Sequence, residues 1–238
     1  MRYLDAFRRR LEQKWKGSLV STSEARETDP NAKKYLSQLV RQGQIEKVVW
    51  GWYWVPADCD GFFEFLAKDR HFKVLHKQTA AAYWSGDFIH RDQFAVAVQD
   101  SSYGRALEKF AASQGWKVRV EARTFARAEY RAVGGLYVEA LEETIADCVK
   151  EWAFMDAFAS LHQNCKTIDW SRISQHYWER IPRSNTRVGQ VVKYGASIIG
   201  REAGSNSYSQ TRARIDDDFV RRQVEEAAER VVELVQTA

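Results

Sequence analysis

The chain has 238 residues, of which 45% are hydrophobic and 29% charged, and its formal net charge is +4. These proportions are typical of a globular protein with enough apolar material for a sizeable core, and they argue against extensive disorder. The three cysteines, Cys59, Cys148 and Cys165, are odd in number and widely spaced, so no disulfide framework is expected. No stretch resembles a signal peptide or a membrane helix. We therefore expect a soluble, cytoplasmic protein with no membrane contact.

The positive charge is concentrated at the start of the chain. Residues 1–57 contain eleven Lys and Arg residues and six Asp and Glu residues, so the excess of +5 there exceeds the net charge of the whole chain. A concentrated basic face is the electrostatic signature of a protein that binds a polyanion such as DNA. A solvated surface without a partner is the alternative explanation of such a bias.

The first elements are predicted to be two helices. Apolar residues from Tyr3 to Trp15 recur at helical spacing, which predicts an amphipathic helix over residues 2–16 that ends at Gly17. After a short extended piece, Ser21 and Glu24 have the spacing of a capping box, which predicts the start of a short second helix.

A basic helix and a β-hairpin follow. Asp29 and Pro30 predict an N-terminus for a helix over residues 30–42, which ends at Gly43. Its apolar residues form one stripe: Ala32, Tyr35, Leu36, Leu39 and Val40. Residues 45–50 and 52–55 are rich in β-formers, with Gly51 at the reversal and Pro56 at the end. We expect Trp52 and Trp54 to seal this hairpin onto the helices.

This order of elements is that of a winged helix-turn-helix, whose basic helix enters the major groove while the hairpin, or wing, contacts the backbone. The helix residues opposite the apolar stripe would reach base edges and phosphates. The predicted DNA-binding residues are Ser21, Thr22, Asn31, Lys33, Lys34, Ser37, Gln38, Arg41, Lys47 and Trp50. A winged helix that contacts only protein is a weaker alternative.

A mixed α/β domain is predicted over residues 62–200. Its elements are a short apolar helix or turn at 62–66, a helix at 78–84, strands at 94–98, 117–120 and 136–138, and an amphipathic helix that ends at Gly115. Helical spacing begins at Leu141, a helix is expected over 171–180, and another follows Pro182 with Ser184 or Asn185 as its cap. The overall class is therefore α+β, with a helical C-terminal part.

The last segment, residues 201–238, is expected to be a Gly/Ser-rich linker followed by a helix. A stripe of Val220, Val224, Ala227, Val231 and Val235 runs along that helix. We expect the stripe to pack on its own domain, and the alternative is a partner helix in a homodimer.

No motif for catalysis, nucleotide binding or metal binding is present. The chain lacks a Walker loop, a dinucleotide-binding glycine motif and a nucleophile elbow. His162 and Cys165 are three residues apart but have no second pair of ligands. We therefore expect no enzyme, no metal and no cofactor. The alternative is a metal-dependent nuclease targeted by the winged helix, with Asp100 and Glu121 at strand ends as metal ligands.

The sequence resembles the AbiEi-like family of prokaryotic transcriptional regulators. The matching stretches are YLSQLVRQGQIEKVVWGWYWVP from Tyr35, HKQTAAAYWSG from His76, EETIADCVKEW from Glu142, DAFASL from Asp156 and RVGQVVKYG from Arg187. The resemblance covers residues 4–200, and the segment after Arg201 has no counterpart.

The resemblance implies a sequence-specific DNA-binding repressor of its own promoter that serves as the antitoxin of a type IV toxin–antitoxin system. The implied DNA-reading residues are Lys33, Lys34, Ser37, Gln38 and Arg41, with Lys47 on the wing. The implied partners are double-stranded promoter DNA and a nucleotidyltransferase-like toxin, which the antitoxin counteracts without tight binding.

Overall fold

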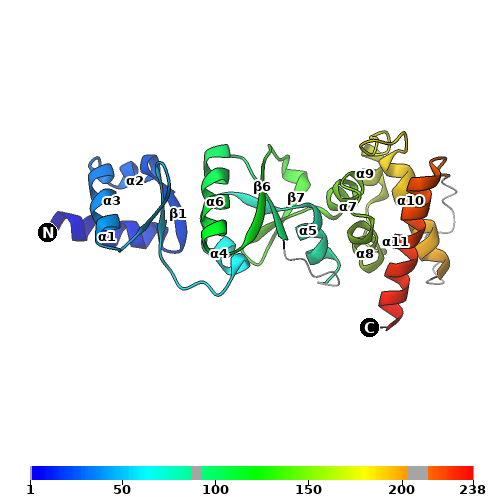
Figure 1. The fold of residues 1–238 in the computed structure, drawn as a ribbon, viewed down its shortest axis with the longest axis horizontal. Helices are drawn as coiled ribbons and strands as arrows, with labels where there is room; N and C mark the ends of the chain where they lie inside the picture. Colours follow the sequence, from blue (N-terminus) through cyan, green and yellow to red (C-terminus); the bar gives the residue numbers. More distant parts are fainter. Residues whose placement is uncertain (1, 87–92, 203–213, 238) are drawn as a thin grey trace. The chain divides into compact units, whose positions relative to one another are not determined.

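The computed structural model describes residues 2–86, 93–202 and 214–237. It is a mixed α and β structure in which helices predominate (Figure 1). None of the described helices combines the length and the apolar composition that a membrane crossing requires.

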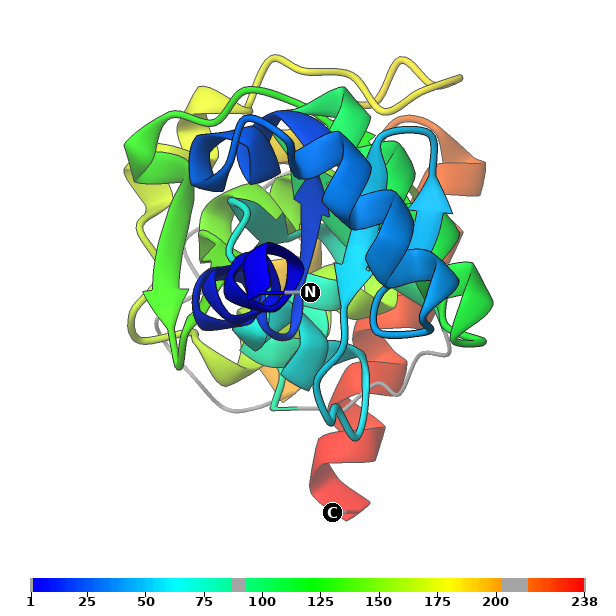
Figure 2. The same cartoon turned by 90° about the vertical axis from the view of Figure 1, so that its left-hand side faces the viewer.

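The N-terminal region consists of three helices and a three-stranded antiparallel sheet of order β1-β3-β2. In chain order its elements are α1 (Arg2–Trp15), β1 (Ser18–Ser21), α2 (Thr22–Thr28), α3 (Ala32–Arg41), β2 (Glu46–Val49) and β3 (Trp52–Val55). Figure 2 looks onto this region, with α1 seen nearly end-on and α3 beside the hairpin β2–β3. The predicted helices and hairpin are therefore confirmed.

The remaining described elements include a five-stranded sheet of order β6-β5-β4-β8-β7. They are α4 (Phe62–Lys68), β4 (Lys73–Leu75), α5 (Lys77–Trp84), β5 (Gln93–Val98), α6 (Ser101–Ser113), β6 (Lys117–Ala122), a 3-10 turn (Arg127–Glu129), β7 (Tyr130–Val133), β8 (Leu136–Glu139), α7 (Leu141–Lys150), α8 (Phe154–Gln163), α9 (Trp170–Gln175), α10 (Val188–Glu202) and α11 (Asp218–Thr237).

The chain divides into two compact units. Unit 1 contains Met1–Val74, Val96–Phe125 and Ala132–Tyr137, and unit 2 contains Leu75–Ala95, Ala126–Arg131 and Val138–Ala238. The core of unit 2 is built mainly from the apolar faces of α7, α8, α10 and α11. On α11, Val220, Val224 and Val231 are fully buried in this core, so the predicted stripe packs on its own unit. The predicted linker falls almost wholly on residues 203–213, which lie outside the described residues.

Contrary to the prediction from the sequence, the two tryptophans of the hairpin do not pack against the core of α1–α3. Trp52 and Trp54 are buried, but the side chains of β3 that face the core of α1–α3 are Tyr53 and Val55. Because side chains alternate along a strand, the tryptophans lie on the opposite face of β3. There the ring of Trp54 packs 4.6 Å from that of Phe110 on α6.

Several predicted boundaries were wrong for local reasons. Helix α3 begins at Ala32 rather than Pro30, because Asp29 terminates α2 and its carboxylate accepts the N–H of Asn31. Helix α9 ends at Gln175, well before Arg180. Helix α10 begins at Val188, so neither Ser184 nor Asn185 is its cap. Strands β4 and β7 and the 3-10 turn were not predicted from the sequence.

Candidate nucleic-acid interface

Helix α3 is amphipathic, as its sequence predicts. Ala32, Leu36 and Leu39 are fully buried, and they pack with Phe7 and Leu11 of α1 in the core of the N-terminal region. The opposite side of the helix is solvent-exposed. The exposed residues of α3 that were predicted to bind DNA are Lys33, Lys34, Ser37 and Arg41, and Gln38 is partly exposed.

The C-terminal end of α3 is set by a glycine. Gly43 has a φ of +66°, a conformation that L-residues adopt rarely. The N–H of Gly43 donates to the carbonyl of Val40 at 3.0 Å, and the N–H of Gln44 donates to that of Leu39 at 3.0 Å. These hydrogen bonds close the last turn of α3 at its C-terminal end.

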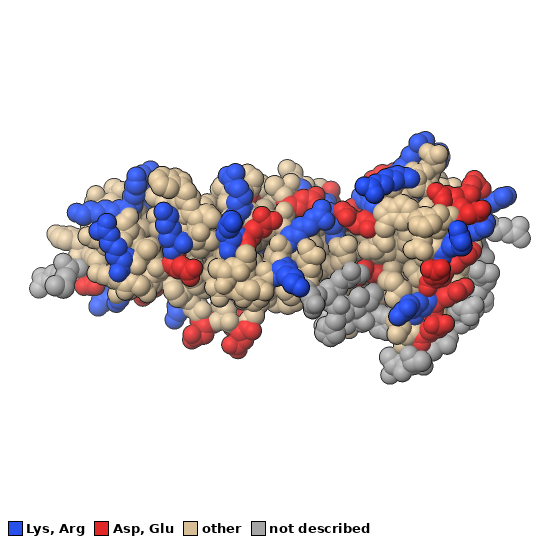
Figure 3. Space-filling model, in the orientation of Figure 1, with Lys and Arg blue, Asp and Glu red and all other residues tan. Residues whose placement is uncertain are grey.

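The basic residues of α3 differ from those of α1 in their partners. On α1, Arg10 lies 3.2 Å from the carboxylate of Asp29, and Lys14 lies 3.1 Å from that of Glu27. In the described part of the chain, no carboxylate pairs with Lys33, Lys34 or Arg41 of α3, nor with Lys47 of β2. Lys and Arg side chains predominate over the α1–α3 elements on the face seen in Figure 3. The cations of α3 and β2 are therefore available to an external anion.

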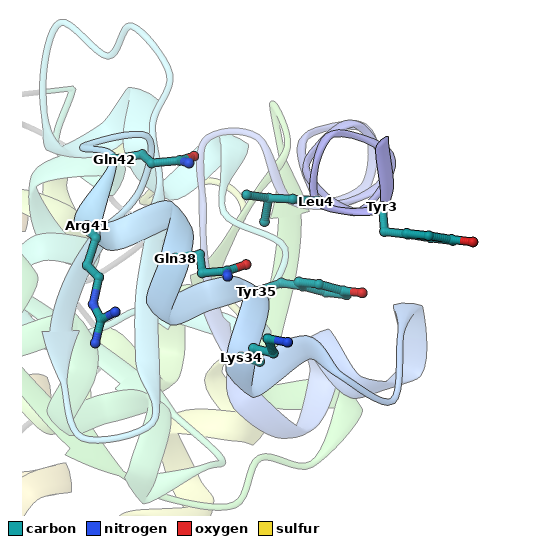
Figure 4. Close-up of a pocket in the computed structure, with 7 residues that line it drawn as sticks. All are labelled: Tyr3, Leu4, Lys34, Tyr35, Gln38, Arg41 and Gln42. Atoms are coloured by element: carbon teal, nitrogen blue, oxygen red, sulfur yellow. The ribbon is translucent and has the colours of Figure 1, made fainter. Parts of the chain in front are cut away.

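A hollow of about 490 Å³ lies where α3 meets the start of α1. The residues that line it are Tyr3, Leu4, Lys34, Tyr35, Gln38, Arg41 and Gln42. Figure 4 shows Lys34, Tyr35 and Gln38 extending from one side of α3, while Arg41 points in a different direction. Polar donors and an exposed ring, that of Tyr3, therefore surround one depression on this surface.

The hairpin carries one cation and one aromatic ring at its tip. Trp50 is 86% exposed, and the Nζ of Lys47 lies 5.3 Å from the centre of its ring. Gly51 makes the reversal with a φ of +78°, and its carbonyl accepts the N–H of Thr22 at 2.7 Å. That bond connects the hairpin tip to the start of α2.

Three of the predicted DNA-binding residues make local side-chain hydrogen bonds, whereas the side chain of a fourth, Asn31, does not cap α3. Ser21 is buried and forms the predicted capping box with Glu24, while the hydroxyl of Thr22 donates to the Gly51 carbonyl at 3.2 Å. The hydroxyl of Ser37 donates to the Lys33 carbonyl at 3.0 Å, and Asn31 precedes α3 with an exposed side chain. Of these four, Ser21 alone is buried.

Unit 1 also contains a buried charged cluster that the sequence reading missed. Its centre is Asp69, whose side chain has no exposed surface. The carboxylate accepts the N–H of Leu19 at 2.8 Å and the hydroxyl of Tyr103 at 2.9 Å, and it pairs with the Nζ of Lys73 at 3.3 Å. The imidazole of His71 lies between Asp69, at 3.2 Å, and Glu24, at 3.0 Å.

The cluster has coupled charges. Burial disfavours protonated His71, but its hydrogen bonds with Asp69 and Glu24 outweigh this and raise the pKa of His71 to about 9. Burial also opposes ionisation of Asp69, but His71 and Lys73 hold the pKa of that carboxyl below its usual range. The ring of His71 stacks on that of Tyr103 with their centres 4.2 Å apart. We interpret this cluster as a structural link between α2, β1, α6 and β4.

The two acids of the nuclease alternative, Asp100 and Glu121, do not belong to a common group of potential metal ligands within the part of the chain that the structure describes. Asp100 caps α6, because its carboxylate accepts the N–H of Ser102 at 2.7 Å, and Glu121 lies on β6. In the described residues, the group of three side chains that could ligate a metal consists of His76, Glu139 and Asp147, and it includes neither acid. The geometry thus gives no support to Asp100 and Glu121 as a pair of ligands.

No protein-family model matches the chain, and no curated protein matches it significantly.

Proposed function

We propose that the protein is a sequence-specific, double-stranded-DNA-binding transcriptional regulator whose N-terminal region acts as a winged helix. In this proposal α3 is the recognition helix and the hairpin β2–β3 is the wing. The observation that carries the proposal is the state of Lys33, Lys34 and Arg41. They are exposed on a helix whose other side is buried, and they have no carboxylate partner among the described residues.

Electrostatics favours a nucleic-acid partner for this surface. A protein that neutralises phosphates releases counterions from DNA, so cations that are not already paired contribute most to affinity. Arg41 carries the planar guanidinium that can bind guanine through two hydrogen bonds, and the amide of Gln38 suits adenine. The cation and ring at the tip of the hairpin, Lys47 and Trp50, suit the sugar–phosphate backbone beside the groove.

The AbiEi-like resemblance of the sequence supports a narrower version of the proposal. The protein would repress its own promoter and would serve as the antitoxin of a type IV system. It would then counteract a nucleotidyltransferase-like toxin without forming a tight complex. Growth of cells that express such a toxin from a neighbouring gene tests this version: co-expression of the chain should restore growth. Growth arrest that persists despite soluble antitoxin would contradict it.

The DNA-binding proposal is tested with the duplex upstream of the protein's own gene. Fluorescence anisotropy should show tighter binding to this duplex than to a scrambled duplex of equal length and composition. Arg41→Ala should weaken specific binding by about 1–3 kcal/mol if the guanidinium reads a base. The matched control is Lys16→Ala, which removes one exposed charge immediately after α1.

Two outcomes would contradict the proposal. One is equal affinity of the protein for the upstream and scrambled duplexes. The other is equal loss of affinity in the Arg41→Ala and Lys16→Ala variants, since binding would then depend on overall charge rather than on α3.

A further inference from the structure

Three side chains of unit 2 meet at one buried point, although they come from distant parts of the sequence. His76, Glu139 and Asp147 each offer one potential ligand atom, and these atoms all lie within 4.8 Å of one another. The exposed fractions of the three residues are 1%, 0% and 8%. Buried carboxylates depend on cations or hydrogen bonds that compensate their charge.

Rigid elements hold all three residues. His76 joins β4 to α5, and its N–H donates to the Ala95 carbonyl at 3.2 Å. Glu139 ends β8, and its carbonyl accepts the indole N–H of Trp84 at 2.9 Å. Asp147 lies within α7, which packs against α5.

Neighbouring groups orient the two carboxylates. The residue after His76 is Lys77, whose backbone φ is +51°. This conformation is unfavourable for residues other than glycine. In this conformation the N–H of Lys77 donates to Oε2 of Glu139 at 2.9 Å. The Nζ of Lys150 lies 2.5 Å from Oδ1 of Asp147. Hydrogen bonds that fix one oxygen of a ligating carboxylate are characteristic of the surroundings of protein metal sites.

We propose that His76, Glu139 and Asp147 bind a divalent transition metal, Zn²⁺ or Mn²⁺. One imidazole nitrogen and two carboxylate oxygens form a mixed ligand set that these ions accept, whereas Mg²⁺ prefers oxygen ligands alone and keeps several waters. The two carboxylates would balance the charge of the ion. The ion would connect α5, β8 and α7 within unit 2, and this role is independent of DNA binding.

Lysines offer the competing explanation. Lys150 already pairs with Asp147, and the Nζ of Lys77 lies 2.9 Å from the carboxylate of Glu151. If such ion pairs fully compensate the buried acids, the site needs no metal and will bind none.

Metal titration of the full chain distinguishes the two explanations. The chelator-treated wild-type protein is titrated with Co²⁺, whose visible absorption reports protein ligands, and with Zn²⁺ and Mn²⁺ by calorimetry. We expect saturation at one equivalent, and we expect the first equivalent of Zn²⁺ to shift the ring resonances of His76 in NMR spectra. Glu139→Gln and His76→Gln should each weaken binding at least tenfold. The control is His162→Gln, a partly buried histidine of α8 outside the group, and it should bind like the wild type.

The proposal is overturned if the wild type gives neither absorption bands nor binding heat, because the lysines then suffice. It is also overturned if metal binds but leaves the His76 resonances unchanged, because the ion then occupies another place. The NMR measurement uses only the wild type, so the test holds even if a variant fails to fold.

Discussion

Unit 1 uses charged side chains in two opposite ways. On α3, Lys33, Lys34 and Arg41 are exposed and have no carboxylate partner among the described residues. Around Asp69, by contrast, the charges are buried or half-buried, and each is paired within a few ångströms. The two sets of charges differ in solvation and in partners. We therefore expect the cluster around Asp69 to affect the stability of the fold and the cations of α3 to affect DNA affinity.

A buried charge is tolerated when a partner compensates its desolvation, whereas an exposed charge without an acidic partner remains available for binding. Removing one partner of a buried pair leaves an isolated charge in the interior, which is costly. Removing an exposed, unpaired lysine costs little stability. Mutations in the two regions should therefore separate stability from DNA affinity.

The largest expected effect is that of Asp69→Asn. Protonated His71 and Lys73 would lose the carboxylate between them, and the free energy of unfolding should fall by about 3–5 kcal/mol. Urea denaturation measures this change. The control is Asp58→Asn, an exposed acid that should change stability by less than about 0.5 kcal/mol. Equal stability of the two variants would mean that the cluster contributes no more than a surface charge.

The second prediction concerns the α3 surface. Replacing Lys33, Lys34 and Arg41 with alanine should weaken binding to the upstream duplex by about a hundredfold, or ~2.7 kcal/mol, and should leave the urea midpoint nearly unchanged. The matched variant replaces three cations of α1, Arg8, Arg10 and Lys14. It should lose much less affinity, because those cations already have acidic partners. The comparison fails if the α1 variant loses as much affinity as the α3 variant.

The third prediction is a pH dependence of stability. Because the pKa of His71 is raised to about 9 in the folded state, its stabilising contribution is complete below about pH 6.5 and is lost as the pH rises through about 9. The free energy of unfolding should therefore fall by up to about 3 kcal/mol between pH 6.5 and 9.5. Contact with Glu143 also raises the pKa of His176, which contributes in the same direction. The difference between the wild type and His71→Gln isolates His71, and a pH-independent difference would contradict this prediction.

The smallest effect is expected for the exposed ion pair of α1. Lys14→Ala removes its pair with Glu27, and because both side chains are substantially exposed, the free energy of unfolding should change by less than about 0.5 kcal/mol. Thermal denaturation at low and high salt measures this contribution. A loss of several kcal/mol would show that surface pairing on α1 is as important as the buried cluster.

Local patterns in the sequence predicted much of the N-terminal region. The apolar stripe of α3, the stop at Gly43, the turn at Gly51 and the capping box of Ser21 and Glu24 depend on neighbouring residues, so spacing alone was informative. The same patterns indicated which side of α3 would be exposed.

Other features depend on contacts between distant segments. Which side of β3 faces the helices is decided by its packing on α6, and no local pattern distinguishes Trp54 from Tyr53. In the sequence, nothing near Asp69 indicates that it is buried, because its partner Tyr103 is distant in the chain. Likewise, the arrangement of β4, β8 and α5 brings His76 close to Glu139.

The central claim is that the unpaired cations of α3 bind DNA phosphates and bases. It is tested most directly by the salt dependence of affinity for the upstream duplex, measured for the wild type and for the variant with alanine at Lys33, Lys34 and Arg41. If the wild type neutralises about four phosphates, log Kd should rise with log salt with a slope of about 3.6. The variant should lose roughly two units of that slope. Identical slopes for the two proteins would contradict the account.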